Sequence, residues 1–253
     1  STKEKFFLKR YKPWGVILFT RNIKNIEQCY QLTYSIRKIF KDKNYPIMID
    51  QEGGRVNRLN KLISFETLTS EYFGKLFVND KKNFNLIFKI FIDTNSFLLT
   101  KLGININTVP VLDLRYKGST NIIGDRSFSN DAKIVSQIGD ICNKNFKINS
   151  IGTVIKHIPG HGLAKVDSHH FTPTIHKNLK FLKNNDFLAF KKKDSLFAMT
   201  GHIIFKKIDP INTVTHSKKI IRIIRNQIKF KNILITDDIS MKSLKGSLED
   251  KTK

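Results

Sequence analysis

The stretch IGTVIKHIPGHG (residues 151–162) joins an apolar, β-branched run to a polar segment broken by proline and glycine. Five other segments have the same form: GVILFTRN (15–22), YPIMIDQEGG (45–54), GININTVPVLD (103–113), SLFAMTGH (195–202) and KNILITDD (231–238). Longer segments of helical period lie between them, such as NIEQCYQLTYSIRKIF (25–40) and DAKIVSQIGDICNKNF (131–146). Near-continuous apolar strands that alternate with helices predict a parallel sheet covered by helices.

Polar side chains stand just past the carboxyl ends of these strands, and they favour a barrel over an open sheet. The positions are Asp50, Asp113, His157, His202 and Asp237. In a barrel such ends converge on one face, where active sites are built. An open nucleotide-binding sheet would more often carry a glycine-rich turn after its first strand, and DQEGGR has no such spacing. We predict an α/β fold of the (β/α)8 TIM-barrel type with six visible units, as a single domain over residues 1–253.

Composition bounds the partners and the compartment. The chain of 253 residues carries a net charge of +24, but its lysines are spread along the whole length, so we expect compositional bias and no nucleic-acid partner. Runs such as KKNFNLIFKIF (81–91) and FKKKD (190–194) are interpreted as solvated faces of amphipathic helices. No apolar stretch reaches the roughly 18 residues of a membrane span, and no signal-peptide pattern is visible. We expect a cytoplasmic monomer without a membrane partner.

The two cysteines, Cys29 and Cys142, lie far apart in helix-like segments. They form no CxxC pair, so the sequence indicates neither a disulfide framework nor a thiolate metal site. We expect reduced, buried thiols.

The segment LITDDISMKSL (234–244) places Asp237 directly after an apolar strand. A carboxylate at a barrel mouth suits a nucleophile facing a substrate. The alternative is an aspartate that caps the next helix, which fits Asp238 at least as well.

Two loops could bind a sugar. IMIDQEGGRVNRL (47–59) places Asp50 at a strand end, where its carboxylate can accept hydrogen bonds from vicinal hydroxyls. The alternative is a structural turn with a Glu52–Arg55 ion pair. NIIGDRSFS (121–129) can present the Arg126 guanidinium to hydroxyl or carbonyl oxygens. The alternative is a structural role, in which Asp125 only holds this arginine.

The segment KHIPGHGLAKVDSHH (156–170) carries four of the seven histidines and raises the choice between a metal site and proton transfer. His157 and His161 have zinc-like spacing only on a helix, and Pro159 argues against a helix here. Lys156 and His157 can instead donate to substrate hydroxyls. In an extended loop Asp167 and His169 point the same way, so Asp167 could fix the tautomer of an acid/base imidazole. A histidine suits this work near neutral pH because its ordinary pKa is about 6.5.

Taken in order, GVILFTRN, DQEGGRVNRL, VPVLDL, GDRSF, KHIPGHGLAKVDSHH, MTGHIIF and ITDDISMKSL closely resemble the bacterial β-N-acetylglucosaminidases of glycoside hydrolase family 3, which recycle peptidoglycan in the cytoplasm. The resemblance runs from Gly15 to Leu244. It implies a (β/α)8 barrel and retaining hydrolysis of a terminal β-linked N-acetylglucosamine from an anhydro-N-acetylmuramic acid partner, with or without peptide. We expect no metal or other cofactor.

By motif position, the resemblance assigns the nucleophile to Asp237 and the acid/base role to His169, paired with Asp167. It assigns substrate binding to Asp50, Arg58, Arg126, Lys156 and His157. Retaining glycosidases usually pair two carboxylates, whereas here the second role falls to a histidine on a loop that must move in. We predict that this loop, with Gly160 and Gly162, is mobile without ligand.

The chain departs from the family pattern at both ends. It opens almost directly at GVILF and ends shortly after Asp237, so we expect six strands in place of eight, in a barrel shortened at both ends. Two other functions stay open: a metal-dependent hydrolase on a similar barrel, and a truncated, non-catalytic remnant.

Overall fold

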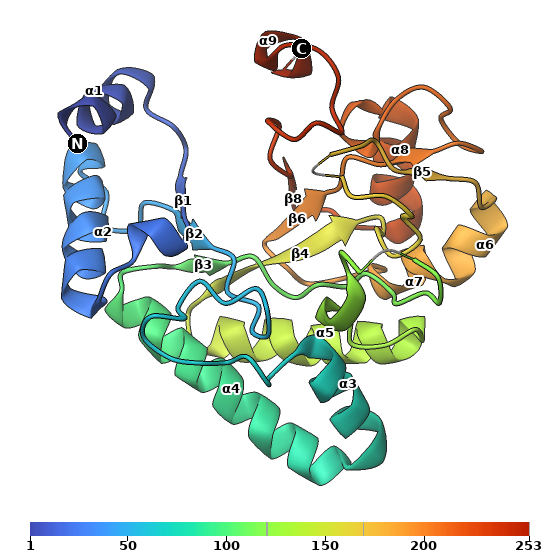
Figure 1. Cartoon of the computed structure of the whole chain (residues 1–253), viewed down its shortest axis with the longest axis horizontal. Helices are drawn as coiled ribbons and strands as arrows, with labels where there is room; N and C mark the ends of the chain where they lie inside the picture. The colour runs from blue at the N-terminus through green and yellow to red at the C-terminus, as the bar shows by residue number, and fades with distance from the viewer. Residues whose placement is uncertain (120, 169, 253) are drawn as a thin grey trace.

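The computed structural model of the chain describes residues 1–119, 121–168 and 170–252. A curled sheet of six parallel strands forms its centre, in the order β1-β2-β3-β4-β6-β8 (Figure 1). The strands are β1 (Val16–Leu18), β2 (Ile47–Ile49), β3 (Ile106–Asn107), β4 (Gly152–Ile158), β6 (Phe197–Thr200) and β8 (Ile233–Thr236). Each lies within one of the six predicted strand segments. The predicted parallel sheet of an incomplete barrel is confirmed, with β1 and β8 as its edges.

Helices connect the strands and cover the outer face of the sheet, with α4 and α5 running beneath it in Figure 1. The helices are α1 (Thr2–Tyr11), α2 (Ile26–Phe40), α3 (Ser70–Asn79), α4 (Lys81–Lys101), α5 (Ala132–Ile148), α6 (Leu179–Asn184), α7 (Asp186–Ala189), α8 (Lys218–Ile223) and α9 (Leu248–Thr252). Short helical turns are η1 (Thr20–Asn22), η2 (Gly124–Arg126), η3 (Val214–His216) and η4 (Ile224–Ile228).

Both helical segments quoted from the sequence start at polar caps. The Asn25 side chain accepts a hydrogen bond from the Gln28 backbone N–H at the start of α2. Asp131 accepts from Lys133 and Ile134 at the start of α5. Such caps satisfy backbone donors that have no partner within the helix, and so they explain where these helices begin.

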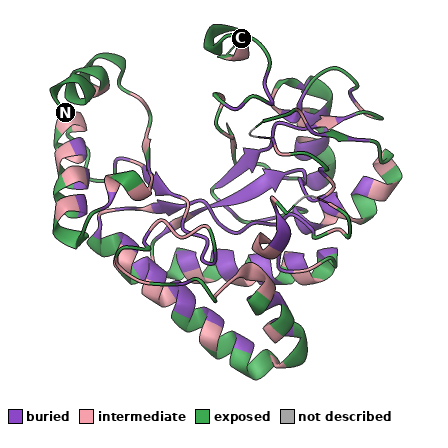
Figure 2. Ribbon diagram, in the orientation of Figure 1, coloured by how far each residue is buried: buried purple, intermediate pink, exposed green. Residues whose placement is uncertain are grey.

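The two faces of the sheet bury different clusters. Ile47, Ile49 and Ile155 belong to the large core between the sheet and its helices. The residues between them along the strands, such as Met48 and Val154, belong to a small cluster on the concave face. Because successive strand residues point to opposite faces, strands such as β2, β4 and β6 contribute to both clusters. Figure 2 shows the sheet as the buried centre of the molecule.

A second, two-stranded parallel sheet pairs β5 (Thr174–Ile175) with β7 (Ile204–Phe205). This pair of strands was not predicted from the sequence. Strands of two residues carry no readable alternation, so only the tertiary contact between the two segments reveals them.

Cys29 and Cys142 are buried and free, as expected.

The interpretation of FKKKD as a solvated helix face is wrong for Lys193, which is buried beyond the end of α7. Its ammonium donates to the Ser136 carbonyl at 2.9 Å and to Asp140 at 2.8 Å. Within the described ranges, none of the helices has the length and apolarity that a membrane crossing requires.

Asp186, the first residue of α7, is a buried carboxyl group against the loop that follows β4. Its Oδ2 accepts a hydrogen bond from the Tyr116 hydroxyl at 2.8 Å, whereas its Oδ1 is buried without a hydrogen-bond partner among the described residues. A Cβ atom on Gly160 would lie 2.7 Å from the Cβ of Asp186, so the two segments are in close contact. Burial raises the pKa of the Asp186 carboxyl to about 7.

We predict that Asp186→Asn stabilises the protein relative to wild type as the pH rises. The folded state holds the Asp186 proton more tightly than the unfolded state, so its stabilising effect is complete below the unfolded pKa of about 3.9 and is lost as pH rises toward 7. Between about pH 5 and about pH 8, the unfolding free energy of the variant should gain on the order of 2–3 kcal/mol over wild type. Urea unfolding at the two pH values measures this difference.

The matched control is Asp194→Asn, since the Asp194 side chain is 82% exposed. Its stability curve should run parallel to that of wild type. Parallel curves for Asp186→Asn and wild type would contradict the assignment of a raised pKa to Asp186.

Candidate active site

A cavity of about 770 Å3 opens where the carboxyl ends of the central strands meet. All of the predicted site residues that the structure describes line it: Asp50, Arg58, Arg126, Lys156, His157, Asp167 and Asp237. His169, the predicted acid/base, lies outside the described residues. The cavity has a size typical of small-ligand sites.

The alternation of the strands explains why these side chains meet. Met48, Val154 and Ile235 face the concave side of the sheet. The residue two positions further along each strand faces the same side, which brings Asp50, Lys156 and Asp237 to one cavity wall. A shift of one residue in any strand would point its functional side chain into the helix layer.

Lys156 lies at the centre of the charged groups. Its ammonium is within 3.0 Å of Asp50 Oδ1 and 2.6 Å of Glu52 Oε1, and it donates to Thr108 Oγ1 at 3.1 Å. The Thr108 hydroxyl in turn donates to Asp50. An ammonium has three donors, and all three have partners within the protein. A substrate hydroxyl that binds Lys156 must therefore replace one of these partners.

Glu52 links the loop after β2 to η2. Its carboxylate accepts two hydrogen bonds from the Arg126 guanidinium, at 2.8 and 2.9 Å. The two alternatives, a Glu52–Arg55 ion pair and an Asp125 that holds Arg126, are both wrong. Arg55 instead pairs with Asp125 at 2.8 Å, because the guanidinium of Arg55 extends across to the 121–126 segment.

Asp50, Glu52 and Lys156 each stabilise the charged form of the others. Burial alone would raise the pKa values of Asp50 and Glu52, but the neighbouring cations outweigh it and hold both below their usual values. Burial alone would lower the pKa of Lys156, yet the two carboxylates raise it. All three groups are therefore charged at neutral pH.

Arg58 closes the same side of the cavity. Its guanidinium is 3.7 Å from Asp50 Oδ2 and lies over the Phe19 ring, 5.5 Å from the ring centre. The guanidinium makes a cation–π contact with the face of this ring. Asp50 thus presents one oxygen to Lys156 and the other toward Arg58 and the cavity.

Asp237 follows β8 directly, as predicted, and its side chain is partly exposed to the cavity. Its Oδ2 lies 4.0 Å from His157 Nε2. Its Oδ1 accepts from the backbone N–H of Asp238 at 2.8 Å, while Asp238 Oδ1 accepts from Ser240 in a turn. The alternative of a helix cap is thus replaced by a turn, because no helix follows Asp238 directly.

A buried carboxylate, Asp113, sets the orientation of His157. Its Oδ2 accepts from His157 Nδ1 at 2.7 Å, which leaves Nε2 pointing to Asp237. The backbone N–H groups of His157 and His161 also donate to Asp113. Burial would raise the pKa of Asp113, but the charge and hydrogen bond of His157 keep it below the usual value. The peptide bond between Lys156 and His157 is cis.

The loop after β4 brings Asp167 to the cavity, and its glycines have packing roles that were not predicted from the sequence. A Cβ atom on Gly162 would lie 2.0 Å from the carbonyl oxygen of Leu114, and one on Gly160 would meet Asp186. These glycines permit close packing of the loop against neighbouring segments. The mobility of the loop stays a prediction.

Four residues were not selected as site residues, although the structure connects them to the cavity: Glu52, Thr108, Asp113 and His161. The position of Asp113 just past a predicted strand could have marked it as a site residue. Glu52 could be recognised only as part of a loop, because its partner Arg126 is 74 residues away in the sequence. Sequence spacing does not reveal a pair formed over that separation.

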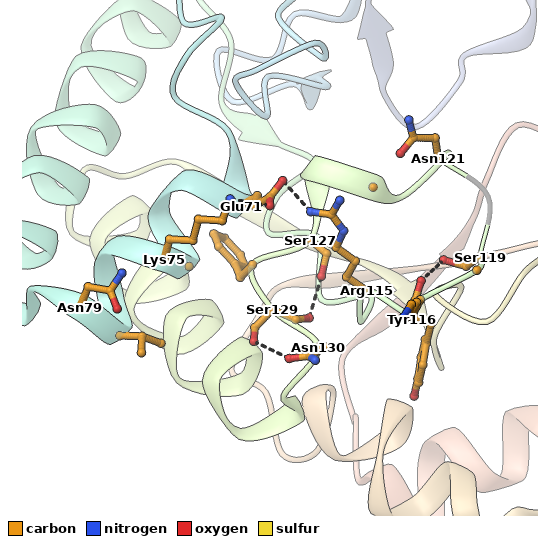
Figure 3. Close-up of a pocket in the computed structure, with 16 residues that line it drawn as sticks. Glu71, Lys75, Asn79, Arg115, Tyr116, Ser119, Asn121, Ser127, Ser129 and Asn130 are labelled. Carbon is orange, nitrogen blue, oxygen red and sulfur yellow. Dashed lines mark hydrogen bonds and ion pairs between the residues drawn. The ribbon is translucent and has the colours of Figure 1, made fainter.

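Two further observations bear on ligands. Among the described residues, no group of three or more His, Cys, Asp or Glu side chains is arranged to hold a metal ion. A separate cavity of about 640 Å3 lies between α3 and the segments 115–119 and 121–130 (Figure 3). There Glu71 pairs with Lys75 at 2.8 Å and with Arg115 at 2.6 Å. None of the strand-end residues lines this second cavity.

A parallel, barrel-type sheet with charged side chains gathered at its strand ends defines the class of protein, since barrel enzymes build their sites at that face. Comparison with known families agrees. Residues 1–251 match the family described as "Glycosyl hydrolase family 3 N terminal domain". The chain belongs to this family.

Relatives and solved structures extend the comparison. The chain is 32% identical to a beta-hexosaminidase of Hydrogenovibrio crunogenus, over 90% of this chain and 64% of the relative. It is 30% identical to one of Neisseria meningitidis serogroup B, over 92% of this chain and 65% of the relative. This chain thus spans slightly less than two thirds of these relatives.

Among solved structures, NagZ from Neisseria gonorrhoeae in complex with N-trifluoroacetyl-D-glucosamine superposes with a TM-score of 0.89 at 27% identity, covering 100% of this chain and 74% of that one. A glycoside hydrolase family 3 β-N-acetylglucosaminidase from Paenibacillus sp. str. FPU-7 gives a TM-score of 0.84 at 26% identity, with 96% and 46% covered.

We predict that Lys156→Met lowers the unfolding free energy by about 3 kcal/mol, because it removes the buried cation that Asp50 and Glu52 share and leaves Asp50 with only the more distant Arg58, at 3.7 Å. The double variant Lys156→Met/Asp50→Asn should recover part of this loss, since it removes the carboxylate that loses its nearest cation. Chemical denaturation at neutral pH measures both changes.

The matched control is Lys147→Met, since the Lys147 side chain is 72% exposed and pairs with an exposed Asp194. Its effect should stay within about 0.5 kcal/mol. An equally small effect of Lys156→Met would show that the buried charges do not depend on this lysine.

Proposed function

We propose that this chain carries the active site of a retaining β-N-acetylglucosaminidase, which removes terminal β-linked N-acetylglucosamine from cytoplasmic peptidoglycan turnover fragments. The single observation that carries the proposal is the meeting of Asp237 with Asp50, Lys156 and His157 at one cavity formed by the strand ends. The names of the relatives, beta-hexosaminidase and β-N-acetylglucosaminidase, support the same sugar.

The charged wall supplies the groups that a sugar ring requires. Asp50 offers carboxylate oxygens to neighbouring hydroxyls, and Arg58 and Arg126 offer N–H donors beside it. Met48, Met199 and Ile235 form an apolar surface on the adjoining part of the cavity. A ring with apolar faces and polar edges fits such a combination of walls.

The chemistry proposed for Asp237 is nucleophilic. Its carboxylate attacks the anomeric carbon, the bond to the leaving oxygen breaks, and a covalent glycosyl-aspartate forms. Water then displaces the aspartate and restores the original anomeric configuration. His157, oriented by Asp113, lies beside the Asp237 carboxylate, with Nε2 4.0 Å from Oδ2.

The acid/base role is proposed for His169, with Asp167 as its carboxylate partner. Asp167 lines the same cavity as Asp237, which supports the placement of this pair on the leaving-group side. The imidazole would donate a proton to the leaving oxygen and then take one from the attacking water. A histidine can do both near neutral pH because its ordinary pKa is about 6.5.

We further propose that residues 1–253 act as one domain and as a monomer, with no nucleic-acid partner and with peptidoglycan-derived amino sugars as substrates. A single large core that includes residues from Leu18 to Phe230 supports the one-domain assignment.

We predict that Asp237→Asn lowers kcat/KM for 4-nitrophenyl N-acetyl-β-D-glucosaminide by about 10³-fold or more, because the amide is a poor nucleophile. Brief exposure of the wild type to a 5-fluoro N-acetylglucosaminyl donor should give a stable adduct. Mass spectrometry of peptides should place the added mass on Asp237.

Asp194→Asn serves as the matched control, because this exposed carboxylate lies before β6, outside the cavity. It should retain wild-type kinetics. Turnover that persists in Asp237→Asn, or an adduct on another residue, would exclude Asp237 as the nucleophile. Turnover that requires an added metal ion would favour a metal-dependent hydrolase, and no turnover at all would favour a non-catalytic remnant.

A further inference from the structure

We propose that His161 and Ser168 are positioning residues: their hydrogen bond sets the place of the segment that carries Asp167 relative to Asp237. The inference rests on the proposed function and goes beyond it. Neither residue touches the reacting atoms. Both act through the loop after β4, which carries Asp167 to the cavity that Asp237 also lines.

The contact itself is buried on both sides. His161 Nε2 lies 3.2 Å from Ser168 Oγ, and the two residues are only 3% and 4% exposed. Serines in loops are mostly exposed, and a buried hydroxyl without a partner is costly. The Ser168 side chain therefore favours the position in which it bonds to His161. This contact fixes the position of the adjacent Asp167, which lines the cavity.

His161 is in turn fixed to the nucleophile side of the site. Its backbone N–H donates to Asp113 Oδ1 at 2.6 Å, and its ring packs edge-on to the His157 ring, with centroids 5.5 Å apart. Asp113 also holds the ring of His157, which faces Asp237. One buried carboxylate thus anchors both the histidine beside the nucleophile and the histidine that holds Ser168.

The protonation state of His161 agrees with a structural contact. Burial lowers the pKa of His161 to about 4, so the ring is neutral near pH 7 and carries one N–H. Its Nδ1 is buried without a hydrogen-bond partner among the described residues. A proton on Nδ1 would leave a buried donor unpaired, so the proton belongs on Nε2, which donates to the Ser168 hydroxyl.

If the segment that carries Asp167 is misplaced, cleavage should slow more for a sugar leaving group than for 4-nitrophenolate. Cleavage of a sugar–sugar bond requires a proton for the departing alkoxide, and general acid catalysis contributes about 10²–10⁴-fold. A 4-nitrophenolate is a stable anion that departs without this proton. Loss of the Ser168 hydroxyl should therefore reduce cleavage of a disaccharide selectively. A general loss of folding would reduce both reactions equally.

The test compares kcat/KM of wild type and Ser168→Ala on two substrates. These are 4-nitrophenyl N-acetyl-β-D-glucosaminide and the β-1,4-linked disaccharide of N-acetylglucosamine. We expect a loss of about 10-fold or more on the disaccharide, a part of the full general-acid effect, and a change of less than about 2-fold on the aryl substrate. His161→Gln, which keeps a nitrogen donor near the position of Nε2, should retain more disaccharide activity than His161→Leu.

The matched control is Ser195→Ala. Ser195 is also buried and donates to the Thr153 carbonyl at 2.9 Å, but it lies before β6, at the opposite end of the sheet. It should leave the ratio of the two activities unchanged. Equal losses on both substrates in Ser168→Ala, or no loss on either, would overturn the inference while the glycosidase function stands. A wild type inactive on both substrates would overturn the proposed function and the inference together.

Discussion

The ion contacts of Lys156 are the constraint on which the site depends. A buried ammonium is tolerated only where carboxylates lie close enough to replace its lost hydration. Asp50 and Glu52 do so from the end of β2, and Thr108 completes the contacts from the end of β3. Three neighbouring strand ends are thereby held in one relative position. Arg126 extends the same constraint to η2 through Glu52.

A second buried group, centred on Asp113, organises the other half of the cavity. It accepts hydrogen bonds from the ring and backbone of His157 and from the backbone of His161. The first group contains the side chains proposed to bind sugar hydroxyls, and the second orients His157 beside Asp237. Because β4 supplies Lys156 to one group and His157 to the other, adjacent residues of one strand join the proposed substrate binding to the proposed chemistry.

Much of this arrangement was predictable because it follows from local rules. Apolar runs that end in polar residues mark strand ends, and all six such runs contain a strand of the central sheet. Parallel strands bring their carboxyl ends to one edge, so the predicted residues that the structure describes meet in one cavity. The pairings were less predictable. Arg55 and Arg126 are both within reach of acidic residues in sequence, and each has a different partner in the fold.

The amino-acid sequence by itself therefore determined the strand and helix pattern, the type of sheet and the residues at its functional edge. These depend on side-chain periodicity and on residue type, which are local properties of the chain. Only the tertiary structure decided which charges pair, that Asp113 orients His157 and that His161 holds Ser168. The charge pairs and the Asp113–His157 contact join residues far apart in the sequence, whereas His161 and Ser168 meet within one folded loop. Burial strengthens the contacts at the cavity because water no longer competes for the same donors and acceptors.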